Sequence, residues 1–374
     1  MRTQRLKALA DRLAETDYDV IALQEIWVES EDWRYMRKVC ASNYAHGTFF
    51  LTGAFGSGLA ILSKHPIVDT ITHMYTLTGR PIFVHHGDWI AGKACGCATI
   101  THPELGLVDI WNTHFTAVGG QVGPETQRAF RTSEAFELAE LCRASAERGR
   151  HVFCVGDLNS LPESLCMSLL YGLAGLQDSF AAVTQRDPES PDAGITCDSP
   201  RNTWTAHKTL DERALRHNGK RLDYILFRGP TQEKNQLQCT EHQVVFTEPI
   251  LAYGVSYSDH FGVEAMFATK GSEAAPTKDA AADVLGRALP VLRDALVHAY
   301  ASQRVSLRWF VGLLGIAVAL VAANVCSSAW LVHGRSVAPS LITALLLIPT
   351  TWAGTTALYD GIVWGEWHKR MLSI

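Results

Sequence analysis

The chain has 374 residues, of which 47% are hydrophobic and 19% are charged, and its formal net charge is -5 at pH 7. This composition excludes a largely disordered protein and is sufficient for one large domain or two ordinary ones. A nucleic-acid enzyme usually carries a basic face, so the acidic balance argues against DNA or RNA as a partner.

Strands with interspersed helices are predicted along the first two thirds of the chain. An amphipathic helix is expected over residues 2–16, and the apolar stretch YDVIALQEIW after it predicts a buried strand that ends at Gln24 and Glu25. Further strands are predicted at SGLAILS, CGCATITH, GLVDIWNTHF, HVFCVGD, LDYILF and FGVEAMF, with a helix over residues 125–147. This order predicts a mixed α/β or α+β domain over residues 1–268.

A different pattern begins after this domain. Residues 269–308 are expected to form a small, polar, Ala-rich linker and then an amphipathic helix, which would either pack on the domain or lie on a membrane surface. Two uncharged apolar runs follow, at about 310–331 and 340–359, within a segment 309–364. Each run is long enough to cross a bilayer. The alternative is a pair of buried helices in a soluble core.

The charges beside the two apolar runs predict a topology. Arg304 and Arg308 precede the first run and Lys369 and Arg370 follow the second, whereas the loop between them holds one Arg. Positive residues favour the cytoplasmic side, so we expect a transmembrane hairpin with a cytoplasmic tail at 365–374. The domain would then face the cytoplasm on an endoplasmic reticulum or mitochondrial membrane.

Polar residues stand at the ends of four predicted apolar strands. They are Glu25 in QEIW, Asn112 and His114 in WNTHF, Asp157 and Asn159 in VGDLNS, and Asp259 and His260 in SDHFGV. Each group alone is compatible with an ordinary turn or a solvated surface residue. A spacing of two in an extended backbone would place Asp157 and Asn159 on the same side of the chain.

Taken together and in this order, the four groups resemble the endonuclease/exonuclease/phosphatase superfamily, also called DNase I-like. Its signatures are a QE, a TH, a GDxN and a C-terminal SDH. The resemblance implies a four-layered α/β/β/α sandwich and phosphodiester hydrolysis. It also implies that Glu25 binds Mg²⁺, a hard cation that prefers oxygen ligands.

The resemblance assigns the remaining residues of these groups to the reaction. His260 would act as the general base that takes a proton from the attacking water, oriented by a nearby carboxylate, Asp259 or Asp157. His114 and Asn159 would donate hydrogen bonds to the phosphoryl oxygens as negative charge builds on them.

Other stretches look like the neutral sphingomyelinase branch, which includes the fungal inositol phosphosphingolipid phospholipase C. They are HHGDWIAGKACGCATI at 85–100, NTWTAHK at 202–208 and RLDYILFR at 221–228. The resemblance implies that Asp88, Lys93, Asn112 and Asp223 belong to substrate-binding or regulatory segments. The implied substrate is a membrane sphingolipid cleaved to ceramide and a phosphorylated head group, with anionic phospholipids as candidate activators and no nucleic acid.

Members of this family open with a strand ending in Asn, in a segment like LNxWG, before the helix expected here at residues 2–16. The printed sequence has no such segment, so the expected sandwich lacks its first strand. An incomplete gene model or a variant with impaired catalysis would each account for this. The alternatives to a sphingolipid phospholipase C are therefore a lipid-binding pseudoenzyme, or a nuclease or inositol phosphatase of the same fold.

Overall fold

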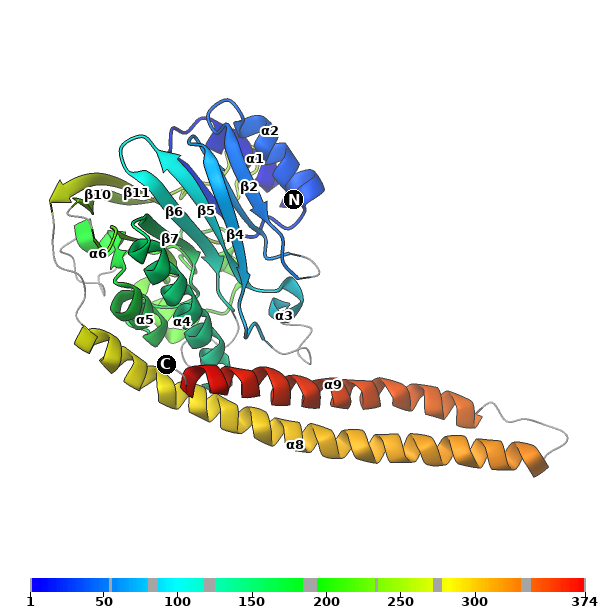
Figure 1. Cartoon of the computed structure of the whole chain (residues 1–374). Coiled ribbons are helices and arrows are strands. Elements are labelled where there is room, and N and C mark those ends of the chain that lie inside the picture. Colours follow the sequence, from blue (N-terminus) through cyan, green and yellow to red (C-terminus); the bar gives the residue numbers. More distant parts are fainter. Residues whose placement is uncertain are drawn as a thin grey trace.

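The computed structural model describes residues 2–53, 56–79, 87–117, 125–183, 194–232, 235–271, 278–330 and 338–372. Its largest sheet has six strands in the order β4-β5-β6-β7-β9-β8 (Figure 1). These strands are β4 (Ile67–Met74), β5 (Ala94–His102), β6 (Gly106–His114), β7 (His151–Asp157), β8 (Gln177–Asp178) and β9 (Asp223–Arg228). Only β6 and β7 pair in parallel in this sheet.

Two smaller sheets complete the β-structure of the described residues. One has the order β1-β3-β2 and consists of β1 (Val20–Leu23), β2 (His46–Phe50) and β3 (Leu59–Ser63). The other is an antiparallel pair of β10 (Asn235–Val245) and β11 (Gly262–Gly271). The predicted strands are therefore present, and β2, β4, β8 and β10 are additional.

Helices cover the outer face of each main sheet, which gives the predicted α/β/β/α layers (Figure 1). Helices α1 (Arg2–Ala14) and α2 (Arg34–Cys40) pack on the three-stranded sheet, with Leu13, Met36 and Leu62 in their shared core. Helices α4 (Glu125–Glu147) and α5 (Leu165–Ala174) pack on the six-stranded sheet. Three shorter helices are α3 (Asp88–Ala91), α6 (Ser179–Val183) and α7 (Glu212–His217).

The core between the two sheets is apolar and tightly packed. Phe50, Ile61, Ala98 and Ile110 are buried there. Gly96 of β5 lies under the Phe50 ring, and a Cβ at this position would overlap ring atoms. The glycine therefore permits the close approach of the two sheets at this position.

The C-terminal part of the chain forms two long helices that lie side by side, α8 (Lys278–Trp330) and α9 (Ala338–Leu372) (Figure 1). The first part of α8 packs on the domain through buried residues that include Val284, Ala288 and Leu292. Packing, rather than lying on a membrane surface, is thus the role of the predicted amphipathic helix. The boundaries predicted at 268 and 308 stay predictions, and the structure continues β11 to Gly271 and runs α8 through residue 308.

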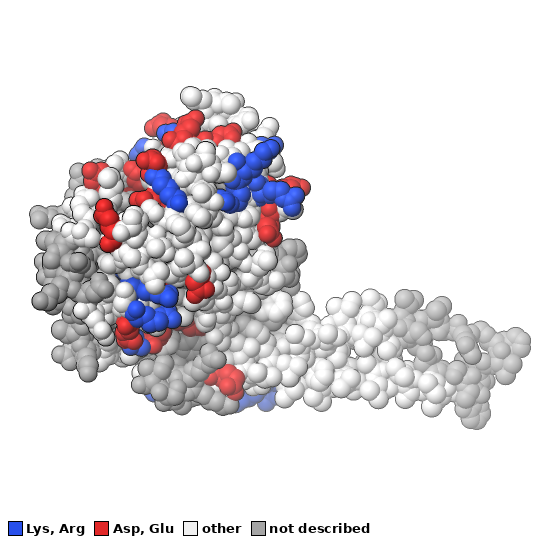
Figure 2. All heavy atoms as spheres, turned by 45° about the horizontal axis from the view of Figure 1, so that its top comes forward, with Lys and Arg blue, Asp and Glu red and all other residues white. Residues whose placement is uncertain are grey.

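Both C-terminal helices are long and apolar enough to cross a membrane, by length and composition. The candidate spans are Ala281–Ala323 and Ile342–Glu366, and only 6% and 22% of their most apolar windows are buried inside the structure. The described part of the hairpin beyond the domain shows no Lys, Arg, Asp or Glu on the face seen in Figure 2. The alternative of two buried helices in a soluble core does not fit this exposure. The loop between the helices lies outside the described residues.

Candidate active site

Three neighbouring strands bring ionisable residues to one edge of the six-stranded sheet. His114 ends β6, Asp157 ends β7 and Asp223 begins β9. The strand register places His114 beside Asp157 and Asp157 beside Asp223. Because β6 and β7 are parallel and β9 is antiparallel to β7, the three side chains share one edge. The strand register alone therefore brings His114, Asp157 and Asp223 together.

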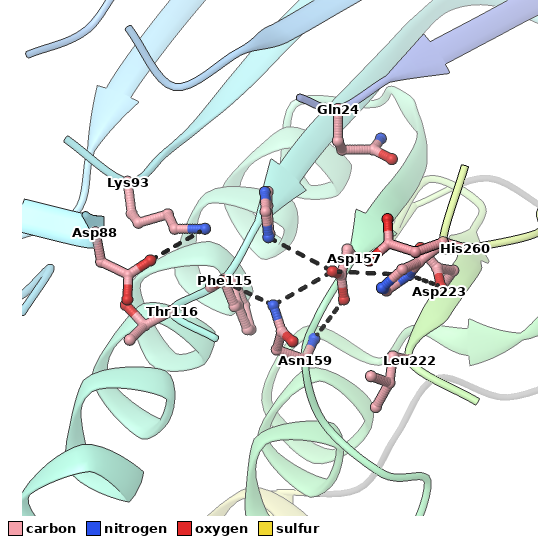
Figure 3. Close-up of polar contacts among 12 residues, drawn as sticks. Gln24, Asp88, Lys93, Phe115, Thr116, Asp157, Asn159, Leu222, Asp223 and His260 are labelled. Carbon is pink, nitrogen blue, oxygen red and sulfur yellow. Dashed lines mark hydrogen bonds and ion pairs between the residues drawn. The ribbon is translucent and has the colours of Figure 1, made fainter. Parts of the chain in front are cut away.

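The turn after β7 is built by the GDLN sequence itself. The Asp157 Oδ1 atom accepts a hydrogen bond from the backbone N–H of Asn159 at 2.8 Å. The Asn159 Nδ2 atom donates to the carbonyl oxygen of Phe115 at 3.0 Å and to Asp157 Oδ2 at 3.3 Å (Figure 3). Both amide hydrogens of Asn159 are thus engaged within the chain. In this structure Asn159 holds the turn, and its predicted donation to a phosphoryl oxygen stays a prediction.

The residue before Asp157, Gly156, must be a glycine for this turn to form. Its φ is 129°, in the region that favours glycine, and a Cβ would overlap the carbonyl oxygen of Thr113 on β6. The glycine allows β6 and β7 to remain paired up to His114 and Asp157.

His260 meets this edge from a segment far along the chain. Its Nδ1 atom lies 2.8 Å from Asp223 Oδ2 and 3.9 Å from Asp157 Oδ2 (Figure 3). Asp259, predicted as one possible orienting carboxylate, instead pairs with Lys208 at 3.2 Å and has 45% of its side chain exposed. Asp259 and His260 therefore contact different partners, Lys208 and Asp223, although they are adjacent in the sequence. Asp223 is the partner that the sequence interpretation missed.

The segment before His260 is held in place by residues 202–204. Asn202 Nδ2 donates to the carbonyl oxygen of Ser258 at 2.9 Å, and Trp204 Nε1 donates to that of Ser256 at 3.0 Å. Thr203 and Ser256 exchange two backbone-to-hydroxyl hydrogen bonds. The NTWTAHK stretch was noted in the sequence only as a resemblance. In the structure it positions the loop that carries His260.

The charges of the cluster shift the pKa values of its members in different directions. Burial alone would lower the pKa of His260, but the carboxylates of Asp223 and Asp157 outweigh it and raise this pKa well above its usual value. Burial and the neighbouring charge of Asp223 raise the pKa of Asp157 to about 7. The pKa of His114 lies well below 6.5, because the side chain is buried and Lys93 and His260 are nearby. His114 is therefore a neutral imidazole at physiological pH.

Solvent access also differs between the two histidines. His260 keeps 24% of its side chain exposed, whereas His114 keeps 8%. The Nε2 atom of His114 lies 3.5 Å from Asp157 Oδ2, and its buried Nδ1 atom has no hydrogen-bond partner within the described part of the chain. Water can therefore reach His260, which is also the histidine with the shorter distance to a carboxylate, 2.8 Å to Asp223.

Asn112 is hydrogen-bonded to residues in and next to the three-stranded sheet. It is fully buried, its Oδ1 atom accepts from Gln24 Nε2 at 2.7 Å, and its Nδ2 atom donates to the carbonyl oxygens of Leu23 and Ala60 at 2.9 and 3.0 Å. These bonds connect β6 to β1 and β3 across the two sheets. In the described structure Asn112 fixes the end of β1, and its predicted place in a substrate-binding or regulatory segment stays a prediction.

Glu25, the predicted metal ligand, follows directly after this connection. It is exposed, lies beyond the end of β1 and has a positive φ of 60°, which is uncommon for a residue other than glycine. A Cβ on Gly58 would lie 3.1 Å from the Cα of Glu25, and the backbone N–H of Ile26 donates to the carbonyl oxygen of Gly58 at 2.9 Å, so Gly58 allows the chain after β1 to pass close by.

Asp88 and Lys93 form a buried pair beside the cluster. Their charged atoms lie 3.4 Å apart, and both side chains are at least 92% buried. Asp88 begins α3 and Lys93 precedes β5, so the short helix closes the pair (Figure 3). His85 and His86 of the same predicted stretch lie outside the described residues. The substrate-binding or regulatory role expected of Asp88 and Lys93 stays a prediction.

A family model described as the Endonuclease/Exonuclease/phosphatase family matches residues 2–260, which include every residue of the cluster. The chain belongs to this family. The superfamily predicted from the four strand-end motifs is thereby confirmed, and the match ends at His260, the last residue of the SDH motif.

Individual relatives of this family match most of the chain. It is 31% identical to "Inositol phosphosphingolipids phospholipase C" of Schizosaccharomyces pombe, over 98% of this chain and 87% of that protein. It is 29% identical to "Sphingomyelin phosphodiesterase 2" of Rattus norvegicus, over 85% and 73% of the two chains. The predicted branch is therefore confirmed as well.

Solved structures support the fold. A crystal structure of beta toxin from Staphylococcus aureus superimposes with a TM-score of 0.54 at 18% identity, over 71% of this chain and 92% of that one. At this identity the likeness establishes the DNase I-like fold and nothing further about the reaction.

Proposed function

We propose that this protein is a membrane-anchored phospholipase C that cleaves the phosphodiester of sphingolipids to ceramide and a phosphorylated head group. The observation that supports it most directly is the His260–Asp223 pair beside Asp157 and His114, in a chain whose relatives bear the names of sphingolipid phosphodiesterases. A histidine oriented by a buried carboxylate is the arrangement that general-base catalysis requires.

We infer that one atom of His260 takes the proton. Nδ1 faces Asp223 and keeps its hydrogen, so once the imidazolium that the two carboxylates favour has lost its other proton, Nε2 can accept a proton from water. Asp223, and at greater distance Asp157, then stabilise the imidazolium that forms. The neutral His114 provides a buried N–H donor for a phosphoryl oxygen, where it adds no charge of its own.

The donor set fits a hard divalent cation such as Mg²⁺. Asp157, Asp223 and His260 place ligand atoms within 4.8 Å of one another, and two buried carboxylates with one imidazole leave negative charge to be neutralised. Asp157 would hold the ion while Asp223 remains with His260, and Glu25 is the further ligand that the sequence predicts. When bound, Mg²⁺ would polarise the phosphoryl group and stabilise the leaving alkoxide.

The hairpin supplies a reason for a lipid substrate. A sphingolipid stays in the bilayer, so a domain anchored there meets it at high effective concentration. Arg304 and Arg308 near the start of the apolar part of α8 support a cytoplasmic domain at an endoplasmic reticulum or mitochondrial surface, where anionic phospholipids would attract them.

The test is release of a water-soluble phosphorylated head group from mixed micelles of sphingomyelin or inositol phosphoceramide by the full chain. We expect Mg²⁺-dependent release that falls about 10³-fold in His260→Ala, because general-base catalysis contributes about 10²- to 10⁴-fold. His65→Ala is the matched control, since His65 pairs with Asp19 on another part of the fold. Absence of release from both lipids, or an unchanged rate in His260→Ala, would contradict the proposal. DNA nicking by the wild type would favour a nuclease instead.

A further inference from the structure

Three exposed apolar side chains gather on one side of the domain. Leu51 follows β2, Met74 ends β4 and Trp89 lies in α3, and they are 67%, 51% and 43% exposed. Large exposed apolar groups that cluster on a surface commonly mark an interaction site. None of them has a part in the catalytic cluster.

The segments that carry these side chains are in direct contact. Thr52, next to Leu51, donates from its hydroxyl to the carbonyl oxygen of Gly92 at 2.9 Å, just after α3. A Cβ on Gly92 would lie 3.0 Å from the Cα of Gly53 and 3.5 Å from the Cε of Met74. The segments that carry Leu51, Met74 and Trp89 therefore adjoin one another, and we name these three exposed side chains the α3 patch.

The α3 patch is continuous with the membrane-spanning hairpin. The hydroxyl of Tyr359 on α9 donates to the carbonyl oxygen of Gly79 at 2.5 Å. A Cβ on Gly79 would in turn lie 3.5 Å from the backbone nitrogen of Trp89. Figure 1 shows α3 beside the middle of α9, on the side of the domain toward which the hairpin extends. The patch therefore lies where α9 leaves its apolar run.

We propose that the α3 patch docks on the surface of the bilayer that the hairpin crosses, with Trp89, Leu51 and Met74 inserted among the lipid head groups. Tryptophan is favoured at this depth, and neighbouring aliphatic groups add buried apolar area. Asp88, one residue before Trp89, pairs with Lys93 beside the cluster, so docking here brings the catalytic edge against the lipid surface. This inference rests on the proposed membrane anchoring and specifies how the domain is oriented on the membrane.

The experiment uses the full chain reconstituted into phosphatidylcholine and phosphatidylserine vesicles. Trp89→Cys is labelled with an environment-sensitive nitrobenzoxadiazole dye in a Cys326→Ser background, because Cys326 is the exposed member of the nine cysteines and the other eight are buried. The control label is at Leu107→Cys, an exposed apolar position at the opposite end of β6 from His114. We expect a blue shift and quenching by spin-labelled lipid at position 89 and neither at position 107.

A second measurement separates docking from chemistry. The triple variant Leu51→Ser, Met74→Ser, Trp89→Ser is expected to hydrolyse sphingolipid in vesicles at least about tenfold more slowly, with unchanged hydrolysis of a water-soluble phosphodiester. A water-exposed dye at position 89, or an equal loss on both substrates, would overturn the docking proposal. If the wild type hydrolyses neither substrate but the dye at position 89 is buried in lipid, the proposed function fails and the docking surface stands.

Discussion

Replacing Asp223 with Asn tests which carboxylate supports the general base. The substitution keeps the size of the side chain and removes the charge 2.8 Å from Nδ1 of His260, while Asp157 remains at 3.9 Å. At an effective dielectric of about 20, unit charges attract by about 6 kcal/mol at the shorter distance and about 4 kcal/mol at the longer, before desolvation is subtracted. Asp223 is thus the larger source of stabilisation for the imidazolium.

Two effects on the rate follow from this substitution. An Asn oxygen can still accept from Nδ1, but an Asn amide hydrogen can instead force the wrong tautomer, so we expect kcat to fall about 10³- to 10⁴-fold. This is about 4 to 5.5 kcal/mol of barrier. Because the charge of Asp223 raises the pKa of His260, its removal lowers that pKa. The acidic limb of kcat/KM against pH therefore moves to lower pH.

The matched control is Asp259→Asn, which removes a carboxylate adjacent to His260 in the sequence but paired with Lys208. Rates are measured in mixed micelles from pH 5 to 9, and circular dichroism verifies that each variant is folded. Surface pairs contribute about 0 to 1 kcal/mol, so Asp259→Asn should change kcat by less than about fivefold. A loss in Asp259→Asn as large as that in Asp223→Asn, with an unmoved acidic limb in the latter, would refute the assignment.

Two further predictions concern stability. Burial raises the pKa of Glu134, whose carboxylate accepts from the backbone and hydroxyl of Thr116, from 4.5 to about 7. The folded state then holds this proton more tightly than the unfolded state, so stability is lost as pH rises from about 4.5 to 7, by about 3 kcal/mol at most. Glu134→Gln should remove this dependence in thermal unfolding at pH 5 and 8, and an equal slope in both proteins would contradict it. Gly156→Ala should cost more than about 3 kcal/mol through strain and overlap with Thr113, and an unchanged melting temperature would show the turn to be more adaptable than the structure indicates.

The sequence was informative where local pattern and sheet geometry coincide. An apolar run followed by a polar residue predicts a strand end, and His114 and Asp157 lie at such ends. Their meeting follows from the parallel pairing of two strands joined by a helix, which the alternation of elements already favours. The edge of the sheet could therefore be predicted without coordinates.

The partner of His260 required tertiary information. The sequence offers Asp259 or Asp157 as the orienting carboxylate, whereas in the structure Asp223 lies 2.8 Å and Asp157 3.9 Å from Nδ1 of His260. Asp223 stands at the start of a strand, 37 residues earlier, and reaches His260 only through the register of β7 with β9. The same limit applies to Asn112, whose polar side chain resembles a ligand in sequence but is saturated by bonds between the sheets.

The sequence pattern did not predict that one helix, α8, connects the domain to the hairpin, because the pattern changes within this helix. The first part of α8 buries one face on the domain, including Val291, Ala295 and Ala299, whereas the part after Arg308 is apolar and mostly exposed. A change of hydrophobic periodicity predicts two separate elements, whereas the structure has one helix that continues past Arg308. If the hairpin crosses a membrane as we propose, the packing of the first part of α8 on the domain and the Tyr359 contact would together fix the orientation of the domain relative to that membrane.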